Sequence, residues 1–202
     1  MPSTVEVFAD VSCPFAHVSL RRLVERRRDT GAKLTLIVRA WPLELVNGEP
    51  LDPELVGHKV EALREQVTPN LFHGFDEVAF PSTFIPAMAL AAAAYRLSSI
   101  AGEQVSLALR DAIFEEGRDV ADPDVLGAIA RAAGVAEVSA ADHQRVLDDW
   151  AEGKARGVQG SPHFFLDGNG FFCPSLRISN HDGHLEVHAD PAGFDRFFAA
   201  VS

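Results

Sequence analysis

Polar and apolar residues follow different patterns in different parts of the chain. Residues 4–9 alternate and are rich in β-branched side chains, residues 14–28 carry apolar positions at helical spacing, and residues 33–39 alternate again. Gly31 stands where the predicted helix would end. Two strands joined by one helix form a parallel, right-handed βαβ unit.

The middle of the chain predicts helices only. Five segments with helical spacing, mostly Ala-rich, follow one another, with glycines at several of their predicted ends: 53–67, 83–101, 103–116, 122–133 and 139–156, punctuated by Gly102, Gly117 and Gly134. We therefore expect a helical insertion over residues 51–156, between two parts of a sheet domain at 1–50 and 157–202.

Strand patterns return after the predicted helices. Residues 162–166 and 171–173 flank an Asp-Gly-Asn-Gly turn; a turn centred on Gly168-Asn169 would place Phe164 opposite Cys173. A second hairpin is predicted from residues 176–179 and 184–188 around His181-Asp182-Gly183, and a helix over 191–200 would cover the sheet. The predicted fold class is therefore α/β with a large all-helical insertion.

Composition and charge exclude several function classes. The 202 residues are 47% hydrophobic and carry a formal net charge of -11, which argues against nucleic acid or an anionic membrane surface as the main partner. No segment has the roughly 20 uninterrupted apolar residues of a membrane span. No apolar leader precedes the first strand, and two cysteines make no disulfide framework, so we expect a cytoplasmic protein with a functional thiol.

Cys13 lies where the first predicted strand meets the first predicted helix. It stands in the run Asp10-Val11-Ser12-Cys13-Pro14-Phe15-Ala16-His17, in which Pro14 suits the first turn of a helix. Free N–H groups and the helix dipole at a helix N-terminus stabilise a thiolate. The pattern predicts a redox-active thiol with a pKa below the roughly 8.5 of a free cysteine, although free cysteines are more often small buried hydrophobes. Ser12 is expected to be the N-cap or to donate to the sulfur.

A second motif precedes the third predicted strand. Gly157-Val158-Gln159-Gly160-Ser161-Pro162 is a glycine-flanked X-Pro at a strand start, where proline loses no ladder bond. An X-Pro bond adopts the cis form at little cost. A cis Pro162 would present the backbone of Ser161 as an edge for an extended peptide or a peptide-like thiol.

The order of these motifs resembles the DsbA family, and within it the cytosolic bacterial FrnE-like branch. The resemblance rests on Cys13-Pro14-Phe15-Ala16 after a strand, Trp41-Pro42-Leu43, Gly157 to Pro162, and the run Ala112-Ile113-Phe114-Glu115-Glu116-Gly117-Arg118-Asp119 in the insert. It implies a thioredoxin-like fold interrupted by a helical domain, thiol–disulfide exchange activity, Cys13 as the attacking cysteine and Pro162 as a cis-proline facing it.

Ala16 departs from the family pattern, which has a resolving cysteine at that position. Attack by one thiolate leaves a mixed disulfide that a second thiol must resolve. Two sources of that thiol stay open: a low-molecular-weight co-substrate such as glutathione, mycothiol or bacillithiol, or Cys173. We therefore expect monothiol chemistry on protein or small-molecule thiols and disulfides, without a tightly bound cofactor; a homodimer is compatible with the sequence.

Further residues are candidates around the thiol. His17 follows Cys13 by one helical turn and would modulate its pKa. Cys173 is a candidate resolving thiol or a structural cysteine, and a zinc site from Cys13, Cys173 and His163 is the least favoured alternative because the close ligand pairs of structural zinc are missing. The residues expected to contact substrate are Pro14, Phe15, Trp41, Ser161 and Pro162.

Two other functions stay open at this point. Kappa-class glutathione transferases and 2-hydroxychromene-2-carboxylate isomerases share the implied architecture, with Ser-Pro-Tyr where this chain has Cys13-Pro14-Phe15. Ala16 agrees with those enzymes, which lack the second cysteine, whereas Cys13 does not. The remaining alternative is a non-catalytic binding protein of the thioredoxin fold.

Overall fold

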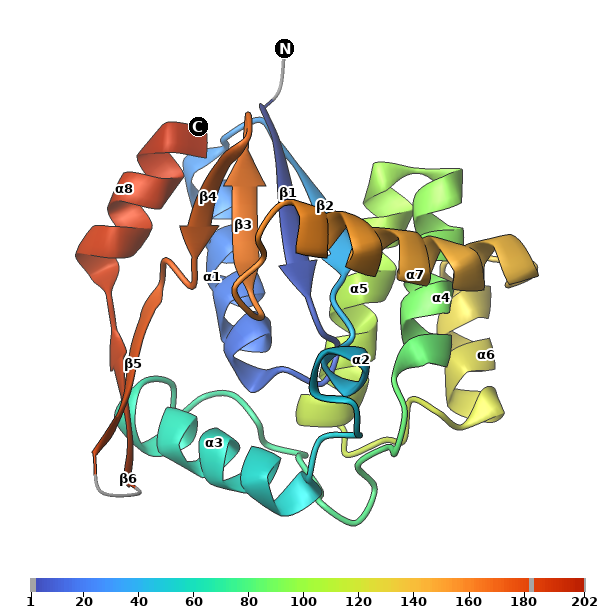
Figure 1. The fold of residues 1–202 in the computed structure, drawn as a ribbon, viewed down its shortest axis with the longest axis horizontal. Helices are drawn as coiled ribbons and strands as arrows, with labels where there is room; N and C mark the ends of the chain where they lie inside the picture. Colours follow the sequence, from blue (N-terminus) through green and yellow to red (C-terminus); the bar gives the residue numbers. More distant parts are fainter. Residues whose placement is uncertain (1–2, 182–183, 202) are drawn as a thin grey trace.

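The computed structural model describes residues 3–181 and 184–201, and a four-stranded mixed sheet lies at its centre (Figure 1). The strand order is β2-β1-β3-β4. Strand β1 (Ser3–Ala9) runs parallel to β2 (Leu34–Ala40) and antiparallel to β3 (His163–Leu166), which pairs antiparallel with β4 (Asn169–Phe172). The start of β3 therefore lies beside the end of β1, since Phe8 pairs with His163.

Alternation along β1 decides what each face of the sheet buries. Val5, Val7 and Ala9 point to one face, where they pack with apolar residues of helices α1 (Pro14–Thr30) and α8 (Pro191–Val201). Helix α8 supplies three phenylalanines to this core, so the prediction that a C-terminal helix covers the sheet is confirmed. Gly31 ends α1 in the left-handed conformation, as predicted.

The opposite face of β1 carries a smaller aromatic cluster. Phe8 meets Trp41 and Phe165 edge to face, with ring centroids 6.4 and 5.7 Å apart. Helix α7 (Ala140–Ala155) crosses this cluster at Gly153, whose missing side chain leaves room for the indole of Trp41.

The segment between β2 and β3 is helical, as the sequence predicted. It contains α2 (Leu43–Asn47), α3 (Pro53–Gln66), α4 (Ile85–Leu97), α5 (Ser99–Phe114), α6 (Pro123–Ala132) and α7. Three details differ from the prediction. Helix α2 lies before residue 51, where no helix was predicted. The expected helix 83–101 ends at Leu97, because Ser98 is extended and its hydroxyl accepts from the N–H of Ala101 as the N-cap of α5. Gly102 lies inside α5 and does not end a helix. A glycine is needed there because a side chain would collide with the ring of Tyr95.

Ion pairs and a β-ribbon join the helical segment to the rest of the molecule. Arg21 and Arg27 of α1 pair with Asp111 and Glu103 of α5. The ribbon of β5 (Leu176–His181) and β6 (His184–Ala189) lies against α3 (Figure 1), where the Gln66 side chain bonds the backbone of β6. Of the turn predicted at His181-Asp182-Gly183, His181 belongs to β5, and residues 182–183 lie outside the described residues. Within the described ranges, no helix is long and apolar enough to cross a membrane.

The β3–β4 hairpin has a different register from the predicted one. Asp167 and Gly168 both adopt positive φ, at 49° and 82°, and form a two-residue turn. Phe164 therefore pairs with Phe171, and Cys173 does not pair with Phe164. Cys173 lies just beyond β4, where its N–H donates to the carbonyl of Pro162 at 3.1 Å.

The close approach of α7 to the aromatic cluster gives a stability prediction. In Gly153→Ala the new Cβ would lie 2.5 Å from Cζ3 of Trp41 and 3.1 Å from Cδ1 of Phe8. Because both rings are buried, we expect a loss of about 1–3 kcal/mol in the free energy of unfolding, measured by urea denaturation.

Gly127→Ala is the matched control on a more open helix. Its new Cβ meets only the flexible end of Arg131, at 3.2 Å. Removing a glycine from a helix interior should then stabilise the protein by up to about 1 kcal/mol. Equal effects of the two substitutions would contradict this packing.

Candidate functional site

Cys13 is the N-cap of helix α1. Its backbone is extended, with φ −84° and ψ 113°, and Pro14 occupies the first helical position, where a missing N–H removes no helical bond. The structure thus places the sulfur at the end of β1 and the start of α1. Ser12 is not the N-cap and does not donate to the sulfur, because its hydroxyl donates to Oδ1 of Asp10 at 2.6 Å. Both predicted roles of Ser12 were therefore wrong.

The loop before β3 faces this sulfur. The Ser161–Pro162 peptide bond is cis, and Sγ of Cys13 donates to the carbonyl oxygen of Ser161 at 3.1 Å. The backbone N–H of Asp10 donates to the Ser161 hydroxyl at 2.9 Å and fixes the two loops against each other. The structure thus brings together Cys13, Ser161 and Pro162, which lie about 150 residues apart in the sequence.

Burial governs the protonation of the Cys13 thiol. Only 4% of the residue is exposed, and this burial raises the pKa of Cys13 above its ordinary value, with a further increase from the Asp10 carboxylate. The Ser161 side chain and the N–H groups at the helix start lower the pKa but do not outweigh burial. The prediction of an acidic thiol was therefore wrong for this arrangement, in which the sulfur is a hydrogen-bond donor.

Asp10 is a site residue that the sequence argument missed. Its buried carboxylate accepts from the backbone N–H groups of Ser12 and Leu43, and its own carbonyl accepts from Arg110 at 3.0 Å. Asp10 followed two residues later by Ser12 is typical of a turn in which a side chain accepts from the backbone. The contact with the Ser12 N–H could therefore have been predicted from the local sequence. The contacts with Leu43 and Arg110 could not be predicted from the local sequence, because they depend on the tertiary fold.

The His17 side chain contacts the helical segment and not the Cys13 thiol. Its Nε2 lies 2.8 Å from Oε1 of Glu115, and its ring packs beside Phe72 and Phe114. Burial lowers the pKa of His17, so the imidazole is neutral at pH 7. Burial alone would raise the pKa of Glu115, but the hydrogen bonds from His17 and from the N–H groups of Phe72 and His73 lower it to about 2.

The other predicted contact residues differ in exposure. Phe15 is half-buried between the two main cores, and Pro14 is buried. Trp41 is 4% exposed and belongs to the aromatic cluster with Phe8 and Phe165. His163 is buried too, with Nδ1 accepting from the N–H of Gln159. Pro14 lies beside the thiol because it follows Cys13 in the chain. The buried Trp41 exposes little surface to a ligand.

Cys173 lies next to the cis-proline but makes no disulfide. Both cysteines are free and buried. Cys173 has φ of 42°, and burial raises its pKa to about 12, with Cys13 as a further cause. No group of three or more His, Cys, Asp or Glu that could hold a metal ion occurs among the residues that the structure describes.

Comparison with known proteins identifies relatives of this arrangement. Residues 4–186 match the family model of the DSBA-like thioredoxin domain. A comparison with curated proteins gives no match.

Solved structures resemble the chain over nearly its full length. The cytosolic disulfide reductase DsbM from Pseudomonas aeruginosa shares 18% identity over 98% of this chain and 96% of its own, with a TM-score of 0.64; DsbM has also been solved with GSH. A probable DsbA oxidoreductase from Streptomyces coelicolor shares 18% identity over 98% and 88%, with a TM-score of 0.64. A 2-hydroxychromene-2-carboxylate isomerase shares 18% over 84% and 88%, with a TM-score of 0.63. The predicted DsbA-like thioredoxin fold is thereby confirmed.

The burial of Cys13 predicts slow alkylation at neutral pH. In Cys173→Ser, where Cys13 is the remaining thiol, the rate of reaction with iodoacetamide should rise with pH, with a midpoint above the roughly 8.5 of a free cysteine. Adding Asp10→Asn removes a carboxylate that raises the pKa of Cys13 and should move the midpoint down. A midpoint below about 7 in the Cys173→Ser protein would show instead that the helix N-terminus dominates.

Proposed function

The chain belongs to the family of DSBA-like thioredoxin domains, and from this premise we propose that it is a thiol–disulfide oxidoreductase working through the single thiol of Cys13. The observation that carries the proposal is the contact between Cys13 Sγ and the carbonyl of Ser161, beside the cis Pro162. A substrate disulfide bound along this loop would lie next to the attacking sulfur.

The exchange needs two thiols, of which the chain supplies one. The Cys13 thiolate attacks one sulfur of the substrate disulfide, the S–S bond breaks, and the leaving thiolate takes a proton from water. A glutathione-like thiolate then attacks the mixed disulfide at the Cys13 sulfur, releasing the second substrate thiol and leaving Cys13 bound to glutathione. A second such thiol frees Cys13 and forms the oxidised dimer, so one substrate disulfide is reduced as two small thiols are oxidised.

Residue 16 supports the assignment of an external resolving thiol. Ala16 is fully buried in the core of α1 and has no group that could attack a mixed disulfide. Cys173, with a pKa raised to about 12, would hold almost no thiolate at neutral pH. The similar DsbM has been solved with GSH, which supports a glutathione-like co-substrate. DsbM is described as cytosolic, which supports the same location for this protein.

Substrate binding would also activate the thiol. The Ser161 carbonyl accepts the Cys13 S–H in the free protein. A backbone N–H of an extended peptide would pair with this carbonyl and take it from the S–H group. The protonated form of Cys13 would then lose one stabilising contact.

Glutathione-dependent reduction of insulin tests the monothiol assignment. Cys13→Ser should fall to the uncatalysed rate, whereas Cys173→Ser should stay within about twofold of the original chain. Mass spectrometry of an acid-quenched reaction should find glutathione on Cys13. In Ala16→Cys, which restores the Cys-x-x-Cys spacing, an internal disulfide should replace that adduct.

Two results would oppose the proposal. Loss of turnover in Cys173→Ser would make Cys173 the resolving thiol. Glutathione-dependent isomerisation of a 2-hydroxychromene-2-carboxylate that survives in Cys13→Ser would favour the activity named for the isomerase of similar fold.

A further inference from the structure

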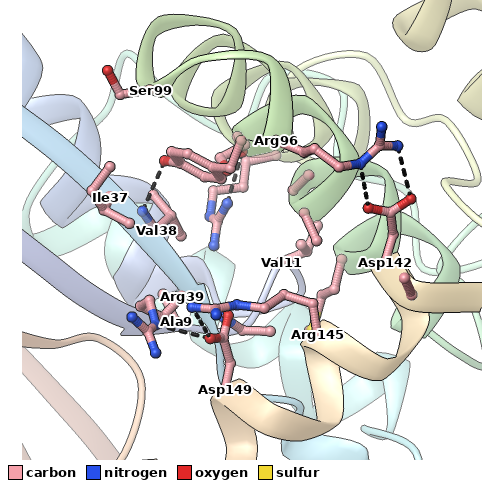
Figure 2. A pocket seen from close by; sticks show the side chains of 18 residues that line it. Ala9, Val11, Ile37, Val38, Arg39, Arg96, Ser99, Asp142, Arg145 and Asp149 are labelled. Carbon is pink, nitrogen blue, oxygen red and sulfur yellow. Dashed lines mark hydrogen bonds and ion pairs between the residues drawn. The ribbon is translucent and has the colours of Figure 1, made fainter. Parts of the chain in front are cut away.

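A cavity of about 620 Å³ lies between the β2 side of the sheet and helices α4, α5 and α7 (Figure 2). Cys13, Ser161 and Pro162 are not among its lining residues. Its volume falls within the roughly 300–1,000 Å³ of small-molecule sites. The proposed thiol chemistry makes no use of this space.

Most of the cavity wall is apolar. The loop after β1 and the middle of β2 contribute aliphatic side chains, and α4 contributes small residues and one methionine: Val11, Ile37, Met88, Ala91 and Ala92. Tyr95 of α4 crosses to β2, where its hydroxyl accepts from the N–H of Val38 at 2.8 Å, and the small residues of α4 leave the space beside its ring open. A ligand here would need an apolar body.

Arg110 of α5 lines this cavity as a buried cation. It is 1% exposed. One terminal nitrogen donates to the carbonyl of Ser106 at 2.7 Å and the other to the carbonyl of Asp10 at 3.0 Å, while Nε has no partner. Within the described ranges, no carboxylate lies in ion-pair contact with Arg110, although the nearby Asp10 carboxylate opposes the lowering of the Arg110 pKa by burial. A buried guanidinium is normally paired with an anion, and a ligand carboxylate would complete this pairing.

The other charges of the lining are already paired with one another. Figure 2 shows Arg96 bonded to both carboxylate oxygens of Asp142, at 3.1 Å each, and Asp149 between Arg39 and Arg145, at 2.8 and 2.9 Å. The lining thus holds four arginines and two aspartates in a protein of formal net charge -11. Arg39 also pairs with Glu6 and Glu152 outside the lining, and Arg110 is the lining arginine without a carboxylate in ion-pair contact among the described residues.

We propose that this cavity binds a small amphipathic organic acid, with its carboxylate on Arg110 and its apolar chain against Val11, Ile37 and the small residues of α4. The buried cation selects the anionic group, and the wall selects the apolar body. Arg110 also donates to the Asp10 carbonyl beside the thiol, but ligand binding in this cavity does not depend on the proposed thiol chemistry.

Calorimetric titration with decanoate tests the site, with decanol as the uncharged probe of the same length. Decanoate should bind saturably, and decanol at least about tenfold more weakly, because it lacks the charge that pairs with Arg110. Arg110→Met should weaken decanoate by at least about tenfold and leave decanol nearly unchanged. Arg131→Met, at an exposed arginine of α6 outside the lining, is the matched control and should bind decanoate like the original chain.

A second variant keeps the test decisive if Arg110→Met fails to fold. Ala92→Phe adds a ring to the cavity from α4 without replacing a charged residue, and it should weaken decanoate and decanol alike by at least about tenfold. Three results would overturn the proposal: no saturable decanoate binding up to about 1 mM, equal affinities for decanoate and decanol, or unchanged affinity in Ala92→Phe.

Discussion

The hydrogen bonds of Asp10 hold the four segments around the thiol in place. Its N–H donates to the Ser161 hydroxyl, its carboxylate accepts from Ser12 and Leu43, and its carbonyl accepts from Arg110. These bonds join the cysteine loop, the cis-proline loop, the segment after β2 and helix α5. All of these groups are buried or partly buried, so each bond also removes a desolvation cost that would otherwise oppose the fold.

This arrangement explains why the cysteine loop and the cis-proline loop meet at one place although they are distant in the chain. Strand β1 pairs antiparallel with β3, so the end of β1 lies beside the start of β3. The bond from Asp10 to Ser161 then fixes the remaining distance, and the carbonyl of Ser161 reaches Cys13. Strand pairing brings the cysteine loop and the cis-proline loop close together, and the bond from Asp10 to Ser161 fixes their relative position.

Local patterns were enough for most of the secondary structure and for the position of the thiol. Alternation along residues 4–9, the Pro14 start and Gly31 end of α1, and the Asp-Pro start of α6 each depend on neighbouring residues only. The errors arose where a choice depended on backbone conformation or distant packing. The hairpin register followed from positive φ at Asp167, and Gly102 was required by contact with Tyr95 and not by a helix end. The contacts of Arg110 with Asp10 and of His17 with Glu115 join distant parts of the chain, so no spacing rule could have found them.

The electrostatics of the site show the same division between local and distant causes. A helix N-terminus lowers a thiol pKa, and that cause is visible in the sequence; the burial that outweighs it comes from residues of other elements packed around Cys13. Burial also limits access to the sulfur, since only 4% of Cys13 is exposed and its S–H is bonded to Ser161. A lone, buried, protonated thiol is protected from the oxidation that a permanently exposed thiolate would suffer. In the proposed mechanism, the burial at position 13 makes the bound substrate open the site, and Ala16 leaves the resolving sulfur to a separate small thiol.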